Sequence, residues 1–208
     1  MNFGIVIFDQ AEELDFVGPW EMVTMWSRFA DGPEECLLVA EKPGPVTCAK
    51  GMSVNPHTTF AECPPLDYLL VPGGEGTRRE VSNPEMLSFV STQAQSARAV
   101  LSVCTGSFVL HAASLLSGKR ATTHWRSLDR LRALGDVDVL EQRYVQDGTV
   151  WSSAGVSAGT DMVLAFIAEV AGEAAAGKVQ FGAEYYPSTR KYGGFEEHAK
   201  APAYVRSS

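Results

Sequence analysis

Cys104 is the residue whose surroundings point most clearly to chemistry. An apolar run, residues 99–103, ends at this cysteine, and the small residues Thr105, Gly106 and Ser107 lead into a second apolar segment, 108–113. A buried strand followed at once by a helix places the thiol on a sharp turn, the nucleophile elbow of serine hydrolases. The helix dipole and the free N–H groups at that turn favour a reactive thiolate. The alternative interpretation is an inert buried cysteine, as most free cysteines are.

A carboxyl group that could serve such a thiol lies near the start of the chain. The segment 12–19 carries Glu12, Glu13 and Asp15, and we expect the first two to be solvated loop charges. Asp15 differs because both of its neighbours in the chain are apolar and are expected to be buried. A carboxyl drawn into a partly apolar cleft tends to hold its proton, so it can act as a general acid and then as a base. The alternative role is that of N-cap for a helix that begins at Pro19.

Two further segments could contact a substrate at the thiol. Gly73 and Gly74 follow Pro72 at the end of an apolar run, and glycine lets a backbone approach a ligand closely. The Gly74 N–H could then donate to a developing negative charge, or the pair could form only a flexible turn. No Gly-Lys-Ser or Gly-Lys-Thr follows, which excludes a phosphate loop. Thr105 brings its amide and hydroxyl to the start of the elbow helix, where it serves either the reaction or the helix alone.

His124 is the histidine with the most suggestive position. It lies twenty residues after Cys104, at the predicted end of the next strand, and a Cys–His pair is the usual way to activate a thiol. A histidine among β-branched and aromatic neighbours is also often a satisfied core group. The other histidines are interpreted as structural or exposed: His57, His111 and His198.

The order of apolar and helical segments predicts an α/β fold with a mostly parallel sheet. Strands are expected at 3–8, 36–40, 66–71, 99–103, 120–123, 137–141 and 143–152, and a hairpin at 46–54. Helices are expected at 19–29, from 83–84 to 97, from the elbow to 118, at 127–134, at 160–171 and at 173–181. In such sheets the ligand crevice lies beyond the carboxyl ends of the strands. The loops that carry Asp15, Gly73–Gly74 and Cys104 should therefore meet there.

Composition bounds the class of protein. The chain has 208 residues, 45% of them apolar, with a net charge of −8, which argues against binding to a phosphate backbone. No apolar run is long enough to cross a bilayer, and no leader pattern is present at the start, so we expect a cytoplasmic protein. The four cysteines form no C-x-x-C pair, which makes zinc or a disulfide framework improbable. We expect one domain, 1–186, and a tail, 187–208, that is mobile or draped over a partner subunit.

Six segments together resemble the ThiJ/PfpI superfamily, which has the class I glutamine-amidotransferase-like fold. The resemblance covers roughly residues 3–185, and its motifs lie at 14–19, 63–67, 72–74, 102–107, 118–125 and 157–161. It implies a flavodoxin-like three-layer sandwich, a mostly parallel sheet with helices on both faces, and a homodimer. Within the superfamily, an aspartate at position 15, where many members have glutamate, and the quartet 104–107 resemble the branch that hydrates isocyanides.

This resemblance implies a substrate and a set of site residues. The substrate is a small-molecule isocyanide, the product an N-substituted formamide, and neither a metal nor an organic cofactor is required. Cys104 would attack the isocyanide carbon, Asp15 would deliver the proton to give a thioimidate, and the ionised carboxylate would then activate water. The resemblance assigns Thr105 to catalysis, and it assigns substrate binding to Gly73, Gly74, Gly18 and His124.

Two alternatives stay open at this point. The first is another reaction of the superfamily, such as amide or peptide hydrolysis or the hydration of a dicarbonyl, and hydrolysis requires His124 close to Cys104. The second is a sensor in which Cys104 binds a small ligand or oxidises to sulfinic acid. Some motifs also resemble the ligand-binding domains of AraC-type regulators, but those continue into a helix-turn-helix region, for which this chain leaves no room.

Overall fold

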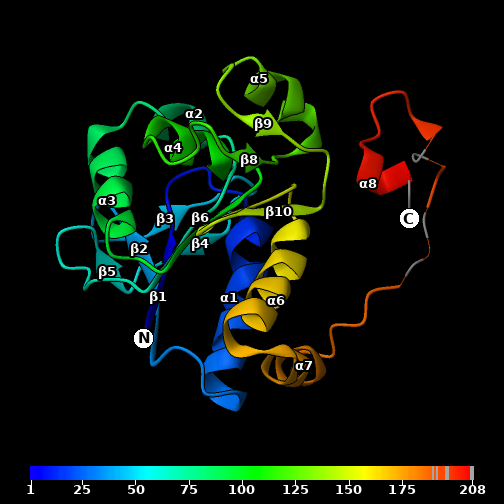
Figure 1. Ribbon diagram of the computed structural model, residues 1–208. Helices are drawn as coiled ribbons and strands as arrows, with labels where there is room; N and C mark the ends of the chain where they lie inside the picture. Colours follow the sequence, from blue (N-terminus) through cyan, green and yellow to red (C-terminus); the bar gives the residue numbers. More distant parts are fainter. Residues whose placement is uncertain (189, 191, 195–196, 207–208) are drawn as a thin grey trace.

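The computed structural model, which describes residues 1–188, 190, 192–194 and 197–206, is built around a seven-stranded sheet (Figure 1). The strand order is β10-β11-β7-β6-β1-β2-β5. All neighbours pair in parallel except β10, which is antiparallel to β11. The strands are β1 (Asn2–Val6), β2 (Glu35–Ala40), β5 (Thr58–Thr59), β6 (Tyr68–Val71), β7 (Ala99–Val103), β10 (Tyr144–Asp147) and β11 (Val150–Ser153).

Helices cover both faces of this sheet, which confirms the predicted three-layer α/β sandwich. Helices α1 (Glu13–Phe29), α6 (Ala158–Ala171) and α7 (Glu173–Gly182) pack together on one face. Helices α2 (Thr77–Glu80), α3 (Pro84–Ala94) and α4 (Gly106–Ala112) form the layer on the other face. Because both faces are covered, β6 and β7 are buried along their whole length, as expected for parallel strands that are continuous apolar runs.

An aromatic cluster joins the sheet to the layer of α1 and α6. The ring of Phe166 on α6 meets Tyr68 edge-on with centroids 5.1 Å apart and Trp151 with centroids 5.7 Å apart. Trp26 on α1 contacts the same phenylalanine at 6.3 Å. Edge-to-face pairs of this kind add to the burial of apolar area, so this core fixes α1 and α6 against the strands that carry the site.

Helix α1 begins earlier than the sequence predicted. It starts at Glu13, so Pro19 lies inside the helix rather than at its first position, and Asp15 lies in its first turn. The predicted alternative of Asp15 as an N-cap is therefore wrong, since the N-cap is Glu12. Proline has no N–H for the carbonyl four residues earlier. Packing of the buried face, which includes Phe16 and Trp26, outweighs this loss.

Smaller elements follow the expected order with shorter bounds. The first hairpin is β3 (Val46–Thr47) and β4 (Ser53–Val54), and the second joins β10 to β11 through Gly148 at φ +61°. Between α4 and β10 lie β8 (Arg120–Ala121), a 3-10 helix η1 (Trp125–Ser127), α5 (Leu128–Arg132) and β9 (Asp138–Val139). Helix α4 is seven residues long and ends at Ala112, well before the expected Gly118.

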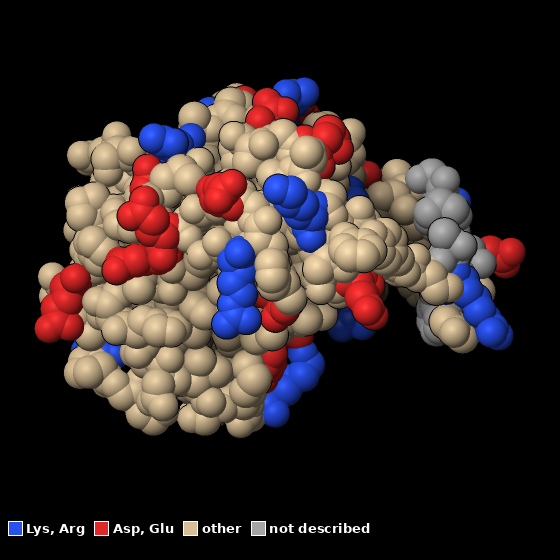
Figure 2. Space-filling model, turned by 90° about the horizontal axis from the view of Figure 1, so that it is seen from below, with Lys and Arg blue, Asp and Glu red and all other residues tan. Residues whose placement is uncertain are grey.

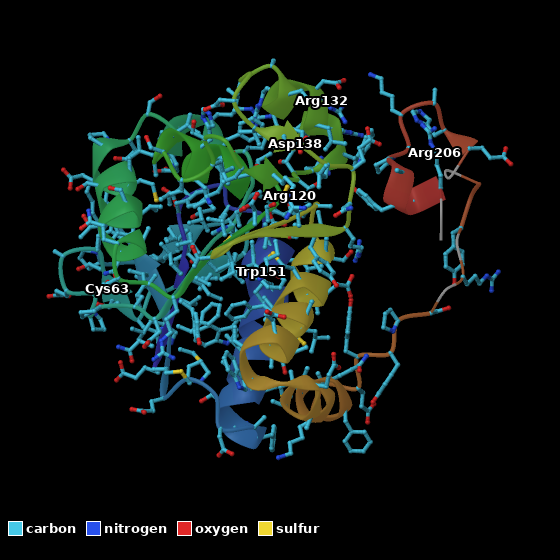
Figure 3. The ribbon with its side chains drawn as sticks, in the orientation of Figure 1. Cys63, Arg120, Arg132, Asp138, Trp151 and Arg206 are labelled. Atoms are coloured by element: carbon cyan, nitrogen blue, oxygen red, sulfur yellow. The ribbon has the colours of Figure 1, made fainter. Side chains whose placement is uncertain are left out.

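The described part of the C-terminal segment lies against its own chain. It ends in α8 (Ala203–Arg206), where the Ala203 N–H donates to a carboxylate oxygen of Glu141 at 3.1 Å. Arg132 of α5 and Arg206 of α8 line a hollow of about 510 Å³ between the two elements (Figure 3). The expectation of a mobile or partner-bound tail falls partly on residues outside the description: 189, 191, 195–196 and 207–208.

The distribution of charged side chains and the length of the helices bear on what the protein can bind. Seen from below, the lysines and arginines are scattered among acidic and uncharged side chains (Figure 2). Among the described residues, every helix is too short or too polar to span a bilayer.

Candidate active site

The chain turns sharply at Cys104, between the end of β7 and the start of α4. This residue has φ +56°, a left-handed conformation that is uncommon outside glycine and often marks functional turns. Its N–H donates to Ser153 O at 3.1 Å, and its carbonyl accepts from the Thr123 hydroxyl at 2.8 Å. These bonds tie the turn to β11 and to the segment after β8. The predicted strand–turn–helix geometry is confirmed at this position.

Asp15 lies beside the thiol and is fully buried. One carboxylate oxygen accepts the Gly73 N–H at 2.9 Å, and the other accepts the Val156 N–H at 3.1 Å. The Cys104 side chain lies close enough to this carboxylate for each group to shift the pKa of the other. Three segments far apart in the sequence therefore converge on one carboxyl group.

The environment raises the pKa of both reactive groups. Burial raises the pKa of Asp15 to about 7, and the Gly73 and Val156 N–H groups and the Cys104 thiol act in the opposite direction. Burial is also the main cause that raises the pKa of Cys104, followed by the charge of Asp15, while the Thr105 N–H and hydroxyl lower it. Cys104 is only 6% exposed, so its thiol stays protonated, whereas Asp15 changes its charge near neutral pH. The expectation of a preformed thiolate is wrong, because desolvation outweighs the start of a seven-residue helix.

Thr105 and the two glycines hold the site together. The Thr105 hydroxyl accepts the Gly74 N–H at 3.0 Å. Because this N–H already has a partner and the Gly73 N–H donates to Asp15, we correct the expectation that Gly74 presents a free donor to the substrate. A β-carbon at Gly73 would lie 2.5 Å from Thr105 N and 2.8 Å from an Asp15 oxygen. Gly73 is therefore required for the close approach of α1, β6 and α4.

His124 and Gly18 lie near the site in different ways. The His124 Nδ1 accepts the Arg126 N–H at 3.2 Å, and burial, followed by the charge of Arg126, lowers the pKa of the imidazole. The main influences on the Cys104 pKa are burial, Asp15 and Thr105, and His124 is not among them. Gly18 faces α6, where a β-carbon would lie 2.6 Å from the Thr160 hydroxyl. Its evident role is close packing between α1 and α6.

Sequence reasoning missed three contributors. Val156 contributes its backbone N–H, and a backbone donor cannot be recognised from the type of side chain in the sequence. Arg143 contacts the first turn of α6, to which the motif 157–161 belongs. Tyr204 is half-buried, and burial is the main cause that raises its pKa. The charges of Cys104 and Glu141 also raise this pKa, and the charge of Arg143 lowers it. Its phenol is therefore within electrostatic reach of the thiol, although the tail carries no pattern that indicates this.

The comparison with known proteins decides the family. The model of the DJ-1/PfpI family matches residues 3–169, a range that contains Asp15, Gly73, Cys104 and Val156. The chain belongs to the DJ-1/PfpI family. Within the part that the structure describes, three or more metal-ligating side chains do not gather into a site.

Relatives of this DJ-1/PfpI protein include both an enzyme and a regulator. The isonitrile hydratase of Pseudomonas putida is 41% identical over 189 residues, which are 90% of this chain and 80% of that protein. The HTH-type transcriptional regulator CdhR of Pseudomonas aeruginosa is 28% identical over 82% of this chain, but this chain spans only 51% of the regulator. A ThiJ/PfpI family protein from Pseudomonas syringae superposes with a TM-score of 0.85 at 33% identity, over 99% of this chain and 83% of that one.

Proposed function

We propose that this protein is an isonitrile hydratase, which adds water to an organic isocyanide to give an N-substituted formamide without a cofactor. The observation that carries the proposal is a buried thiol on a strand-to-helix turn beside a fully buried carboxyl group, Asp15, whose pKa is about 7. The similarity to the isonitrile hydratase of Pseudomonas putida supports the same conclusion. An isocyanide carbon accepts a nucleophile and then needs a proton on that same carbon, and this pair supplies both.

The first half of the reaction uses one shared proton. The Asp15 carboxylate accepts the thiol proton while the sulfur of Cys104 forms a bond to the isocyanide carbon. One C–N π bond breaks and its electron pair moves to nitrogen, while the isocyanide carbon keeps the lone pair that will accept a proton. Asp15 then returns the proton to the carbon, which gives a thioimidate, and the carboxylate is ionised again.

The second half consumes one water molecule. Asp15 accepts a proton from water, the hydroxyl oxygen bonds to the thioimidate carbon, and the nitrogen receives the proton. Asp15 next accepts the hydroxyl proton as the C–S bond breaks, and it passes this proton to the departing sulfur. The products are the formamide, a neutral thiol and a carboxylate, which is the starting state.

Neighbouring groups have supporting roles in this proposal. The Gly73 and Val156 N–H groups keep Asp15 oriented toward the thiol. The Thr105 N–H and hydroxyl stabilise the developing charge on sulfur, since both lower the pKa of Cys104. His124 is neutral and accepts through Nδ1, so its proton is on Nε2. It can donate a hydrogen bond to the isocyanide substituent.

The alternatives receive less support. A hydrolase that uses a Cys–His pair needs the imidazole to take the thiol proton, but the groups that act on the pKa of Cys104 are Asp15 and Thr105 rather than His124. A cysteine that oxidises easily has thiolate character, whereas burial raises the pKa of this thiol.

Turnover of p-nitrophenyl isocyanide tests the proposal. We expect the purified protein to form the formamide, measured by liquid chromatography, and Cys104→Ala to form none. Cys63→Ala is the matched control, because Cys63 is a partly buried thiol whose pKa is also raised and it lies outside the site. Failure of the wild-type protein to form formamide at saturating substrate would contradict the proposal.

The family resemblance extends the proposal to a homodimer, and the sequence pattern extends it to a cytoplasmic location. Sedimentation velocity of the purified full chain tests the assembly, for which we expect twice the monomer mass of 22.4 kDa. A single species at the monomer mass would contradict this part of the proposal and leave the chemistry unaffected.

A further inference from the structure

A cluster of four polar side chains lies next to the site and is not used by the chemistry above. The Arg143 guanidinium pairs through Nε with Asp161, in the first turn of α6, and donates through Nη2 to the Ser157 hydroxyl at 3.1 Å. The Tyr185 hydroxyl donates to the other oxygen of Asp161 at 2.8 Å. Residues from the β9–β10 connection, from α6 and from the segment after α7 therefore meet at one point. The ion pair is partly buried.

The backbone between β11 and α6 links this cluster to both reactive groups. The Cys104 N–H donates to Ala154 O at 3.2 Å, and the Val156 N–H donates to Asp15 at 3.1 Å. The Ala154 N–H in turn donates to the carbonyl of Arg143 at 2.9 Å. Arg143 thus holds the turn 154–157 at both ends, by its carbonyl at Ala154 and by its side chain at Ser157.

We infer that Arg143 is a positioning residue for the proposed hydration: by fixing the turn 154–157, it keeps the Val156 N–H on the Asp15 carboxylate. The predicted change in the pH dependence of kcat/KM rests on the proposed function. The effect of Arg143 on the pKa of Asp15 can be measured without any substrate. A planar guanidinium that bonds to a carboxylate and a hydroxyl together fixes geometry in a way that a lysine ammonium does not.

The consequence is a change in the proton affinity of Asp15. An N–H that bonds to a carboxylate favours its charged form, and two or three such bonds lower a carboxyl pKa by about 2 units, so one is worth about 0.6–1 unit. The other groups that act on Asp15 are the Gly73 N–H, Cys104, Glu12 and Lys50, and a change at Arg143 leaves their contacts in place. If the Val156 N–H moves away, the Asp15 pKa rises from about 7.

The sign of the kinetic effect follows from the starting state. The reaction begins with an ionised Asp15, so kcat/KM falls as the pH drops through the Asp15 pKa. A higher pKa moves this acid limb to higher pH. KM at pH 9, where Asp15 is ionised in either case, should change little.

Arg143→Met tests the inference, with Arg143→Lys as the conservative variant and Arg120→Met as the matched control. Arg120 lies on β8 (Figure 3), and its side chain pairs with Asp147 and donates to Gln146 O, both on β10 and outside the turn 154–157. The primary readout is the titration midpoint of Asp15 by NMR of protein labelled with ¹³C in its aspartates, with the resonance assigned by its absence in Asp15→Asn. The second readout is the acid limb of kcat/KM.

We expect the midpoint and the acid limb to rise by about 0.6–1 unit in Arg143→Met, by less in Arg143→Lys, and not at all in Arg120→Met. If Arg143→Met fails to fold, Ser157→Ala removes only the bond at 3.1 Å and should raise the midpoint by a smaller amount. An unchanged midpoint in a folded Arg143→Met, or in Ser157→Ala where that variant fails, overturns the inference. A raised midpoint in a protein that forms no formamide would overturn the proposed function and leave the inference standing.

Discussion

Replacing Asp15 by asparagine separates two properties of the site: the turnover of an isocyanide and the reactivity of the Cys104 thiol toward alkylation. The variant loses the group that moves protons, so turnover of an isocyanide should fall by about 10²–10⁴-fold, the usual contribution of general acid–base catalysis. Alkylation of Cys104 by iodoacetamide needs only the thiolate. Its rate above pH 7 should therefore rise in Asp15→Asn, whereas turnover falls. The fold should persist, because the asparagine oxygen can still accept one of the two N–H groups that Asp15 accepts.

The size of the change in alkylation follows from the Asp15 pKa of about 7. In the wild-type protein above pH 7, the thiol proton passes to the neighbouring carboxylate, so the thiolate content is set by sharing one proton and stops rising with pH. In Asp15→Asn that proton must leave for solution, so the thiolate content rises tenfold per pH unit. The two rates should agree below pH 7, and the variant should exceed the wild type about a hundredfold at pH 9.

The assay is the rate of iodoacetamide labelling of Cys104 between pH 6 and pH 9, followed by peptide mass spectrometry. Cys63 in the same samples is an internal reference, because burial alone raises its pKa and its profile should not respond to the substitution. Parallel profiles for the wild type and Asp15→Asn from pH 6 to pH 9 would refute the reasoning. They would show that the carboxylate does not accept the thiol proton.

Three further substitutions probe the supporting contacts. Gly73→Ala places a β-carbon 2.5 Å from Thr105 N, so kcat should fall about a hundredfold, the cost of an ångström-scale misplacement; activity near that of the wild type would contradict this reason. Thr105→Val removes a hydroxyl that lowers the Cys104 pKa, so iodoacetamide labelling should slow at every pH, and faster labelling would contradict it. Tyr204→Ala should accelerate labelling of Cys104 at least several-fold, because it removes a half-buried phenol whose pKa the charge of Cys104 helps to raise. Arg206→Ala, on the same helix, is its control, and equal rates in the two variants would exclude a covering role for Tyr204.

Local patterns were sufficient for most of the fold. The runs 66–71 and 99–103 predicted strands because parallel strands covered on both faces are apolar throughout, and β6 and β7 lie within those ranges. Asn83 predicted a helix start, and its side chain does accept the Glu85 N–H. The convergence of Asp15, Gly73 and Cys104 also followed from the sequence, since the loops after parallel strands share one edge of the sheet.

The start of α1 was mispredicted because a local signal competed with a tertiary one. Proline is favoured in the first turn of a helix, so Pro19 predicted the start at that position. The helix begins at Glu13 instead, because the turn before the proline buries Phe16 and places Asp15 against Gly73. The gain comes from residues that are far away in the sequence, so no local pattern indicates it.

The electrostatics of the site were also beyond local reasoning. The elbow pattern indicated a thiolate, but the pKa of Cys104 depends on how completely distant segments cover it, and burial proved to be the largest cause. The Val156 N–H is a backbone group, and any residue except proline would provide it at that position. Arg143 is separated from Asp161 by 18 positions, so its contact with α6 follows only from the folded structure.

The most direct test of the account is the detection of the covalent intermediate on Cys104. Wild-type protein mixed with p-nitrophenyl isocyanide, quenched in acid within milliseconds to seconds and digested should contain a peptide with Cys104 heavier by the mass of one isocyanide. This species should rise and then decay as the formamide appears, and it should be absent from Cys104→Ala. Formamide production without any adduct, or an adduct confined to another residue, would contradict the account.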